Sequence, residues 1–559
     1  MPNIKSLIES NFPFASYWPH QYDIITDITT KLKESNNYIL EAPTATGKSV
    51  IAYAAAKSIL DNEYPNELIE DSPKILICTL TKQLQKQYID SFKTQRDTSY
   101  IYSGRNYKCA LYPELQDTAD ACYYGHPLCL GFKKCPDIAN CKYQIQKKKF
   151  LKHRIGITNY HYFLKSKLKT NILILDECHE LEKLLADEVT ITLSSLSLIR
   201  FSNTILKIKV KGIKNTNTTK FLTTLKKLVI SKDTSISDIE EYVKLFIDNF
   251  EPLIGDISDY IDQLEVTDET TIKYAKSLTM LQDIISKYNS FLNSNTDWVI
   301  SEKFKDGTNH KIVVKPLNVQ EFFQDSIAHR ADKIIFMSAT VCGVKSYTEN
   351  LNILNYDYLE VPATIPVNHR QVYFISNIGN LNYRNRTELL PRFVECIDTI
   401  ITYHRKCDEN VNGIIHSVSY ANAEFIKEHS SFKQDIIIPT ADQKNNIDLT
   451  LGLGKKILVS PSMGTGIDLY NDRSRFQILL KVPYLNLGDN WVKQKLNQDN
   501  IWYVRNAIIS IIQCSGRSVR SVDDFANTYI LDSNFNRLLN NHLDLFPKYY
   551  LNAIKISSV

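Results

Sequence analysis

Residues 41–50 read Glu-Ala-Pro-Thr-Ala-Thr-Gly-Lys-Ser-Val, and this stretch makes the most specific chemical demand in the chain. The apolar run at residues 38–40 predicts a strand before it, and the apolar spacing from Val50 to Ile59 predicts a helix after it. A strand, a short polar loop ending in Gly-Lys-Ser and a helix form the context of a phosphate-binding P-loop. A helix N-cap loop that contains Gly-Lys-Ser by chance is the alternative on this motif alone.

A P-loop would give the polar groups of this stretch distinct roles. Backbone N–H groups and the helix N-terminus would hold the phosphates, Lys48 would reach the β and γ phosphates, and the Ser49 hydroxyl would bind Mg²⁺. Ala42 stands where the usual pattern has its first glycine. We expect the ATP-binding residues of the loop to be Ala42, Thr44, Thr46, Gly47, Lys48 and Ser49.

Length and composition limit the classes of protein. A chain of 559 residues is too long for one core, and its 43% hydrophobic and 23% charged residues are typical of a soluble globular protein. The formal net charge of +4 is small, so a nucleic-acid surface would have to be a local groove. The sequence contains no signal-peptide pattern and no run of about 18 apolar residues. We therefore expect an intracellular, cytoplasmic protein that contacts no membrane.

A cluster of cysteines follows the P-loop region. Of the eleven cysteines, five lie between residues 109 and 141, separated by 12, 6, 5 and 5 residues. These gaps are wider than in most structural zinc sites and suit an iron–sulfur cluster, whose four thiolates can converge from dispersed positions. Zinc and a chance grouping of free thiols remain alternatives. We expect the ligands to be Cys109, Cys129, Cys135 and Cys141, with Cys122 as the alternative ligand.

Two features suggest a track for a nucleic-acid backbone. A predicted strand at residues 74–80 ends near Thr79, where a hydroxyl at the carboxyl end of a parallel strand could contact phosphates. A basic strip follows the cysteines, although a solvated helix face would explain it as well. The strip consists of Lys142, Lys147, Lys148, Lys149, Lys152 and Arg154.

A second acidic motif would complete the nucleotide site. The apolar strand predicted at residues 171–175 ends in Asp176-Glu177-Cys178-His179. Asp176 could hold Mg²⁺, and Glu177 could orient or deprotonate the attacking water. Residues 189–311 then show long amphipathic patterns without catalytic clusters, which predict an inserted helical domain.

The C-terminal half predicts a second parallel α/β domain. Strand patterns recur after residue 333 and alternate with helical stretches. Residues 463–468 follow one strand, and residues 513–520 lie on or near a helix. Arg517 and Arg520 are three residues apart, so on a helix they would share a face and point together at the γ-phosphate.

Taken together, these motifs resemble superfamily 2 helicases. A-P-T-A-T-G-K-S, D-E-C-H, S-A-T, S-P-S-M-G-T-G-I-D and Q-C-S-G-R-S-V-R occur in helicase order. The closer resemblance is to the XPD/DinG family of iron–sulfur helicases, through G-R-N-Y-K-C, C-K-Y, I-T-N-Y-H-Y-F-L, K-P-L-N-V and G-I-I-H-S-V-S-Y. It covers nearly the whole chain except the helical insert.

The resemblance implies an α/β fold of two RecA-like motor domains with two insertions. We expect motor domain 1 at residues 1–104, 151–188 and 312–345, a cluster domain at 105–150, a helical arch domain at 189–311 and motor domain 2 at 346–559. We expect no nuclease domain ahead of Gln21. Gln21 alone resembles an ordinary surface residue, but the family resemblance implies that it recognises adenine.

The resemblance also implies ATP, Mg²⁺ and a 4Fe–4S cluster as cofactors and 5′→3′ movement on single-stranded or forked DNA, by a monomer. The catalytic residues would be Lys48, Asp176, Glu177, Gln513, Arg517 and Arg520, with Gly466 and Asp468 as further nucleotide contacts. The DNA contacts would be Thr79, Arg105, Lys147, Lys148 and Thr465. An RNA-directed translocase or remodeller, and a redox-sensing nucleic-acid-binding protein with weak ATPase, remain alternatives.

Overall fold

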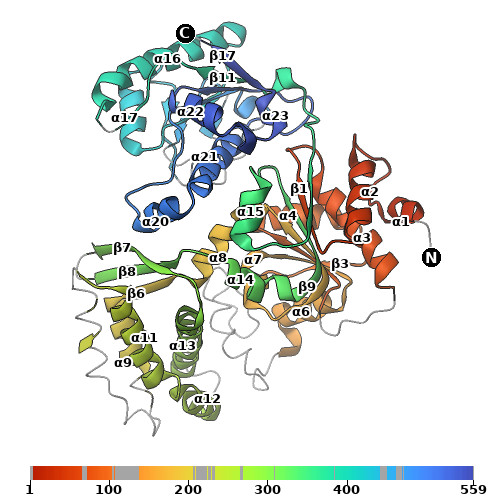
Figure 1. Ribbon diagram of the computed structural model, residues 1–559, viewed down its shortest axis with the longest axis vertical. Helices are drawn as coiled ribbons and strands as arrows, with labels where there is room; N and C mark the ends of the chain where they lie inside the picture. The colour runs from red at the N-terminus through yellow and green to blue at the C-terminus, as the bar shows by residue number, and fades with distance from the viewer. Residues whose placement is uncertain are drawn as a thin grey trace.

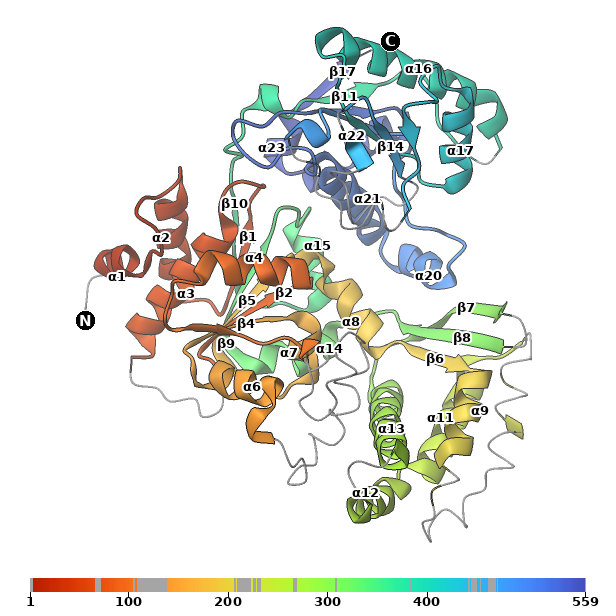
Figure 2. The same cartoon turned by 180° about the vertical axis from the view of Figure 1, so that it is seen from behind.

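The structure is a computed structural model of the chain. It describes residues 4–65, 72–103, 106–107, 138–205, 208, 223–224, 228, 233–264, 269–306, 309–382, 384–440, 443, 450–452, 454–460, 469 and 471–557. Two seven-stranded sheets form separate halves, and a small three-stranded sheet with helices on one face forms a third body (Figures 1 and 2). Among the described helices, none has the length and apolar character needed to span a bilayer.

Domain 1 is built on a parallel sheet with the order β10-β1-β9-β5-β2-β4-β3. Its strands are nearly continuous apolar runs because helices cover both faces. The strands are β1 (Asn37–Glu41), β2 (Ile75–Thr79), β3 (Thr98–Tyr100), β4 (Ile155–Asn159), β5 (Thr170–Asp176), β9 (Ala331–Ser338) and β10 (Tyr356–Glu360). Its helices are α1 (Ile4–Asn11), α2 (Gln21–Lys31), α3 (Lys48–Glu63), α4 (Lys82–Phe92), η3 (Ile138–Asn140), α6 (Lys142–Lys152), α7 (Tyr160–Lys165), η4 (Cys178–Glu180), α8 (Leu181–Val189), α14 (Gln320–Ser326), η6 (Ala328–Arg330) and α15 (Val344–Leu351).

The strand order of domain 1 places its site residues at one edge. β1 and β5 both pair with β9 in parallel, so the P-loop after β1 and the acidic residues at the end of β5 lie on either side of the end of β9. The carboxyl edge of a parallel sheet is where α/β folds bind ligands. The strands predicted next to these motifs are confirmed.

Domain 2 is built on a second parallel sheet, with the order β13-β14-β12-β15-β16-β11-β17. The predicted two-domain α/β fold is therefore confirmed. The strands are β11 (Val372–Ile375), β12 (Gly413–His416), β13 (Ile436–Ile437), β14 (Ile457–Ser460), β15 (Phe476–Leu479), β16 (Asn527–Ile530) and β17 (Ile554–Ser557). The helices are η7 (Val367–His369), α16 (Arg386–Cys407), α17 (Tyr420–His429), η8 (Asn471–Arg473), α20 (Asn490–Gln498), α21 (Asn500–Ser515), α22 (Asn534–Asn541), η9 (Leu543–Leu545) and α23 (Lys548–Leu551).

The inserted arch domain contains strands that the helical pattern did not predict. The antiparallel sheet β6-β8-β7 carries α9 (Ser195–Ile205), α11 (Ile236–Phe250), α12 (Leu253–Gln263) and α13 (Glu269–Asn293) on one side (Figure 1). Its strands are β6 (Ile191–Ser194), β7 (Trp298–Asp306) and β8 (Asn309–Pro316). β8 runs across the boundary expected after residue 311, and β10 extends the first sheet beyond residue 345.

Candidate active site

The loop between β1 and α3 folds back on itself. Gly47 adopts a positive φ of 74°, a conformation that favours glycine, and α3 begins at the next residue. Lys48 Nζ donates to the carbonyl of Ala42 at 2.9 Å, and Thr46 Oγ1 donates to the carbonyl of Pro43 at 2.8 Å. The ammonium group therefore lies within the loop, beside the N–H groups of the first turn of α3. This is the arrangement that binds phosphate in P-loops.

Gln21 braces this loop from the start of α2. Its side-chain oxygen accepts the N–H of Trp18 at 2.9 Å, and its Nε2 donates to the carbonyl of Thr46 at 3.2 Å. A Cβ on Gly47 would lie 2.3 Å from Gln21 Nε2, so a larger residue there would displace the brace. Gln21 is only 2% exposed, and the interpretation as a surface residue is therefore wrong. Its recognition of adenine stays a prediction.

The acidic pair lies at the end of β5. Asp176 is 5% exposed, and its Oδ1 accepts the N–H of Glu177 at 3.1 Å. Burial, and then the negative charge of Glu177, raises the pKa of Asp176, while the nearby Lys48 ammonium lowers it. Glu177 has a positive φ of 54°, an uncommon conformation that turns the chain directly after the strand. Two neighbouring carboxylates opposite a lysine form a site that a divalent cation would stabilise.

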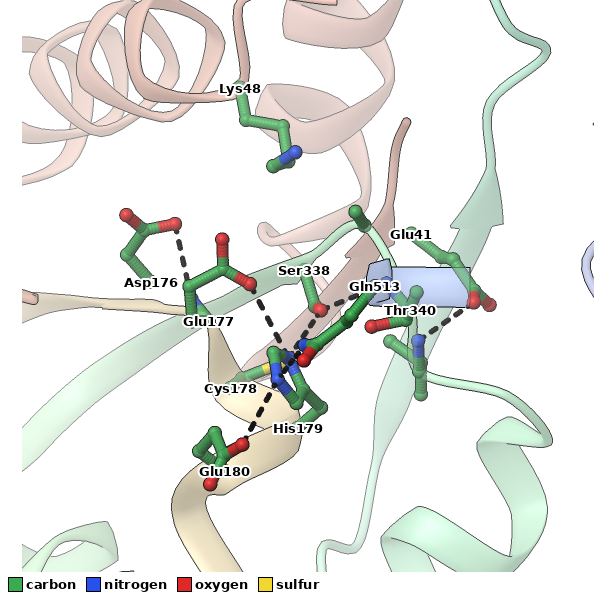
Figure 3. Close-up of polar contacts among 12 residues, drawn as sticks. Glu41, Lys48, Asp176, Glu177, Cys178, His179, Glu180, Ser338, Thr340 and Gln513 are labelled. Carbon is green, nitrogen blue, oxygen red and sulfur yellow. Dashed lines mark hydrogen bonds and ion pairs between the residues drawn. The ribbon is translucent and has the colours of Figure 1, made fainter. Parts of the chain in front are cut away.

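His179 connects this pair to two other segments (Figure 3). Its Nδ1 lies 2.8 Å from the hydroxyl of Ser338 at the end of β9 and 3.4 Å from Glu177 Oε2. Its Nε2 is in hydrogen-bond contact with the side-chain amide of Gln513, which lies on α21 of domain 2. The Gln513 amide can donate to Nε2, which leaves Nδ1–H to donate to Ser338. His179 therefore joins the acidic motif, the end of β9 and domain 2.

A cavity of about 320 Å³ lies between the two domains at this point. Domain 1 lines it with Pro43, Thr44, Glu177 and His179, and domain 2 lines it with Gln513, Arg517 and Arg520, among other residues. The prediction that both arginines share a helix face is wrong, because α21 ends at Ser515 and Gly516 caps it. The loop after the helix nevertheless brings both arginines to the same cavity.

Comparisons with known proteins agree with this architecture. Residues 15–207 match the family described as type III restriction enzyme, res subunit, and residues 415–550 match the helicase C-terminal domain family. The 3′-5′ exonuclease DinG of Staphylococcus epidermidis is 21% identical over 616 residues. The alignment covers 91% of this chain and 66% of DinG, so the chain spans about two thirds of the length of that relative.

Solved structures match nearly the whole chain. An XPD helicase matches 98% of this chain and 100% of its own with a TM-score of 0.62 and 17% identity, and Xpd4 of S. tokodaii matches 97% and 100% with a TM-score of 0.58 and 16% identity. In its two family matches and in its fold the chain is similar to helicases of the XPD/DinG type. At these identities the structural matches show the shared fold alone.

The predicted cluster ligands of this XPD/DinG-like chain fall mostly outside the described residues. Cys109, Cys122, Cys129 and Cys135 lie there, and Cys141 is half-buried at the N-cap of α6. Within the described part of the chain, no group of three or more His, Cys, Asp and Glu residues could hold a metal. The cluster and its ligand set therefore stay predictions.

Of the predicted DNA contacts, the structure describes Thr79, Lys147 and Lys148. Thr79 is fully buried and its hydroxyl faces the carbonyl of Thr158 at 3.3 Å, which leaves no exposed atom of Thr79 for a strand to contact. Lys147 and Lys148 lie on α6, half-buried and exposed respectively. Arg105 and Thr465 lie outside the described residues, as do the predicted nucleotide contacts Gly466 and Asp468.

Glu41 was not identified from the sequence. This last residue of β1 is 2% exposed, and its Oε1 accepts the N–H groups of Val341 at 2.7 Å and Cys342 at 3.0 Å. Its Oε2 accepts the hydroxyl of Tyr358 on β10 at 2.7 Å. Glu41 thus joins the strand before the P-loop to the loop after β9. The sequence feature that could have identified Glu41 is its position as a carboxylate at the end of an apolar strand.

Proposed function

We propose that the chain is an ATP-driven DNA helicase that moves 5′→3′ along single-stranded DNA and separates forked duplexes. The observation that carries the proposal is the contact between His179 and Gln513, which joins the two domains at the edge of a cavity lined by P-loop residues of domain 1 and two arginines of domain 2. Such a cavity changes shape whenever the domains move, so nucleotide turnover and domain motion would be coupled.

The residues around the cavity divide the chemistry of hydrolysis between them. Ser49 and Asp176 would hold Mg²⁺, which would supply positive charge to offset the charge that develops on the phosphate. Glu177 would orient the attacking water and accept its proton. Arg517 and Arg520 would stabilise the transferred γ-phosphate only when domain 2 is closed on domain 1. Hydrolysis would remove that attraction and allow the cleft to open.

The resemblance to XPD/DinG helicases supports DNA as the substrate and 5′→3′ as the direction. The test is unwinding of matched forks that carry a 5′ tail or a 3′ tail, made of DNA or RNA, with Lys48→Ala as the control. We expect ATP-dependent unwinding of the DNA fork with the 5′ tail. Unwinding from the 3′ tail would overturn the direction, and activity on RNA alone would favour the remodeller. Absence of ATP hydrolysis with every strand would overturn the whole proposal.

A 4Fe–4S cluster held by Cys109, Cys129, Cys135 and Cys141, with Cys122 as the alternative, forms part of the proposal. The position of Cys141 at the N-cap of α6 supports it, because a helix N-terminus favours an anionic ligand. Four thiolates would hold the cluster, and metal binding would supply folding energy to a segment whose short, polar sequence does not predict a core of its own.

We predict that protein purified without oxygen contains about four iron and four sulfide per chain and no stoichiometric zinc. Cys141→Ser should lose the iron and the unwinding of forks but keep part of the strand-stimulated ATPase, because the motor domains have their own sheets. Cys407→Ser, which changes an exposed cysteine of domain 2, is the control. One zinc and no iron per chain would contradict this prediction.

A further inference from the structure

Three charged side chains are buried together where domain 2 meets domain 1, outside the nucleotide cavity. Glu182 lies on α8, three residues after His179, whereas Lys495 lies on α20 and Arg505 on α21. Lys495 Nζ lies 2.9 Å from Glu182 Oε1, and Arg505 Nη2 lies 3.2 Å from Glu182 Oε2. The three residues are 6%, 3% and 2% exposed. We call Glu182, Lys495 and Arg505 the buried anchor.

The buried anchor contains two cations and one carboxylate. Within the described part of the chain neither cation has a second carboxylate partner, and Nε and Nη1 of Arg505 have no hydrogen-bond acceptor. Two aromatic rings stabilise the cations through cation–π contacts. Arg505 lies 5.6 Å from the ring centre of Tyr347 on α15, and Lys495 lies 5.0 Å from that of Trp502. Both cations therefore depend on Glu182, and removing its charge would leave them buried without a counterion.

A second contact between the domains, from His179 on η4 to Gln513 on α21, is much easier to break. His179 and Gln513 contact each other through a single side-chain hydrogen bond at the edge of a cavity, and water from the cavity can replace either partner. Arg505 and Gln513 are eight residues apart on α21, which is about 12 Å along a helix. A rotation of domain 2 that opens the cavity would break the contact of His179 with Gln513 and keep the buried anchor.

The helix α20, which carries Lys495, also contacts the arch domain (Figures 1 and 2). Asn490 donates to the carbonyl of Ile300 on β7 at 2.9 Å, and Ser301 donates to Asp489 Oδ1 at 2.7 Å. Trp491 Nε1 donates to the carbonyl of Pro316 at 2.7 Å. The α20–α21 pair is thus held at two places: the buried anchor joins both helices to α8 of domain 1, and the start of α20 contacts the arch sheet.

We propose that Glu182 is a positioning residue that fixes the α20–α21 corner as the pivot of domain 2. Opening and closing of the nucleotide cavity is then a rotation about the buried anchor, in which the far end of α21 carries Gln513, Arg517 and Arg520 toward and away from the phosphates. This role deepens the proposed function and rests on it. Glu182 touches neither nucleotide nor Mg²⁺ and acts through α21.

The test compares Glu182→Gln with Glu188→Gln in the full chain. Glu188 lies on the same helix, and its ion-pair partner His161, at 3.7 Å, belongs to domain 1. Amide hydrogen exchange of the nucleotide-free protein should rise at least ~10-fold across residues 490–515 in Glu182→Gln and stay unchanged in Glu188→Gln. Strand-stimulated kcat should fall about 10-fold or more in Glu182→Gln, because Gln513, Arg517 and Arg520 would no longer be held in their catalytic positions. Affinity for a fluorescent ATP analogue should stay within about 2-fold, because Lys48 and Ser49 are untouched.

If amide exchange across residues 490–515 is the same in Glu182→Gln as in the wild type, the pivot is overturned and the proposed function stands. A wild-type chain without ATPase would overturn the proposed function, and the exchange measurement would still decide the pivot. If Glu182→Gln does not fold, Lys495→Met replaces it, since this variant keeps a one-to-one pair of Glu182 with Arg505. In Lys495→Met, amide exchange should rise across residues 490–498 and stay low across 500–515. If exchange in both helices equals that of the wild type, the proposal is overturned.

Discussion

Domains 1 and 2 are each built on a seven-stranded parallel sheet, and they differ in the residues with which they line the cleft. Domain 1 supplies the loop after β1 and, from the end of β5, the acidic pair and His179, and these two strands flank β9. Domain 2 brings polar and charged groups to the same cavity from α21 and the loop that follows it, and other lining residues from β11, β16 and α23. Groups of domain 1 should therefore govern nucleotide binding and turnover, whereas those of domain 2 should govern turnover alone.

The largest effect should come from the P-loop lysine of domain 1. Lys48→Ala removes the ammonium that lies within the loop, and we expect strand-stimulated ATP hydrolysis to fall by about 10³-fold, with strand binding largely retained. Steady-state phosphate release and fluorescence anisotropy of a labelled strand measure the two quantities. Lys57→Ala is the control, because this lysine of the same helix pairs with Asp97 at 3.1 Å. Turnover near the wild-type rate in Lys48→Ala would remove the P-loop assignment.

The next largest effect should separate binding from chemistry within domain 1. Glu177→Gln removes the proposed general base and keeps the side-chain shape and Asp176, so hydrolysis should fall about 10²-fold while Mg-ATP still binds. Equilibrium binding of a fluorescent ATP analogue and single-turnover hydrolysis distinguish the two steps. Loss of nucleotide binding in this variant would indicate a structural role for Glu177, whose positive φ already marks a constrained turn.

The domain 2 counterpart is Arg520→Lys, which keeps the charge and removes the planar fork. We expect kcat to fall about 10-fold with the affinity for ATP nearly unchanged, because the guanidinium would act only in the closed state. Arg473, half-buried on η8 of the same domain and outside the lining of the nucleotide cavity, is replaced by Lys as the control. An equal loss of ATP affinity in Arg520→Lys would show that domain 2 also binds the ground state, and the contrast between the domains would fail.

The contrast between the domains also explains which features the sequence could predict. The strands beside the motifs are buried on both faces, so their apolar runs are visible in one dimension. The place where α21 ends depends on Gly516, and nothing in the spacing of Arg517 and Arg520 reveals it. Contacts such as Glu182 with Arg505 join residues 323 positions apart, and no local pattern records them. The strands of the arch domain flank long helices, whose periodicity dominates the sequence pattern of that region.

The smallest effect should come from the support behind the P-loop strand, through Tyr358→Phe. The Tyr358 hydroxyl donates to Glu41, so its loss should destabilise the chain by about 1–3 kcal/mol and leave ATP turnover within about 2-fold. Burial raises the pKa of Glu41, and the Tyr358 hydrogen bond counteracts that rise. A raised folded-state pKa contributes stability below the ordinary pKa of glutamate, and this contribution is lost as the pH rises through the raised value. The variant raises the pKa further, so its loss of thermal stability should be greater at pH 8 than at pH 5.

Thermal unfolding at the two pH values measures this difference, with Tyr356→Phe as the control. Tyr356 lies two residues earlier on β10, and its hydroxyl has no hydrogen bond within the described part of the chain. An equal shift in melting temperature at both pH values would mean that the Tyr358 hydroxyl contributes packing rather than charge stabilisation. A large loss of turnover in Tyr358→Phe would instead place Glu41 among the groups that align the P-loop during hydrolysis. Domain 1 would then control catalysis from behind its sheet edge as well as at it.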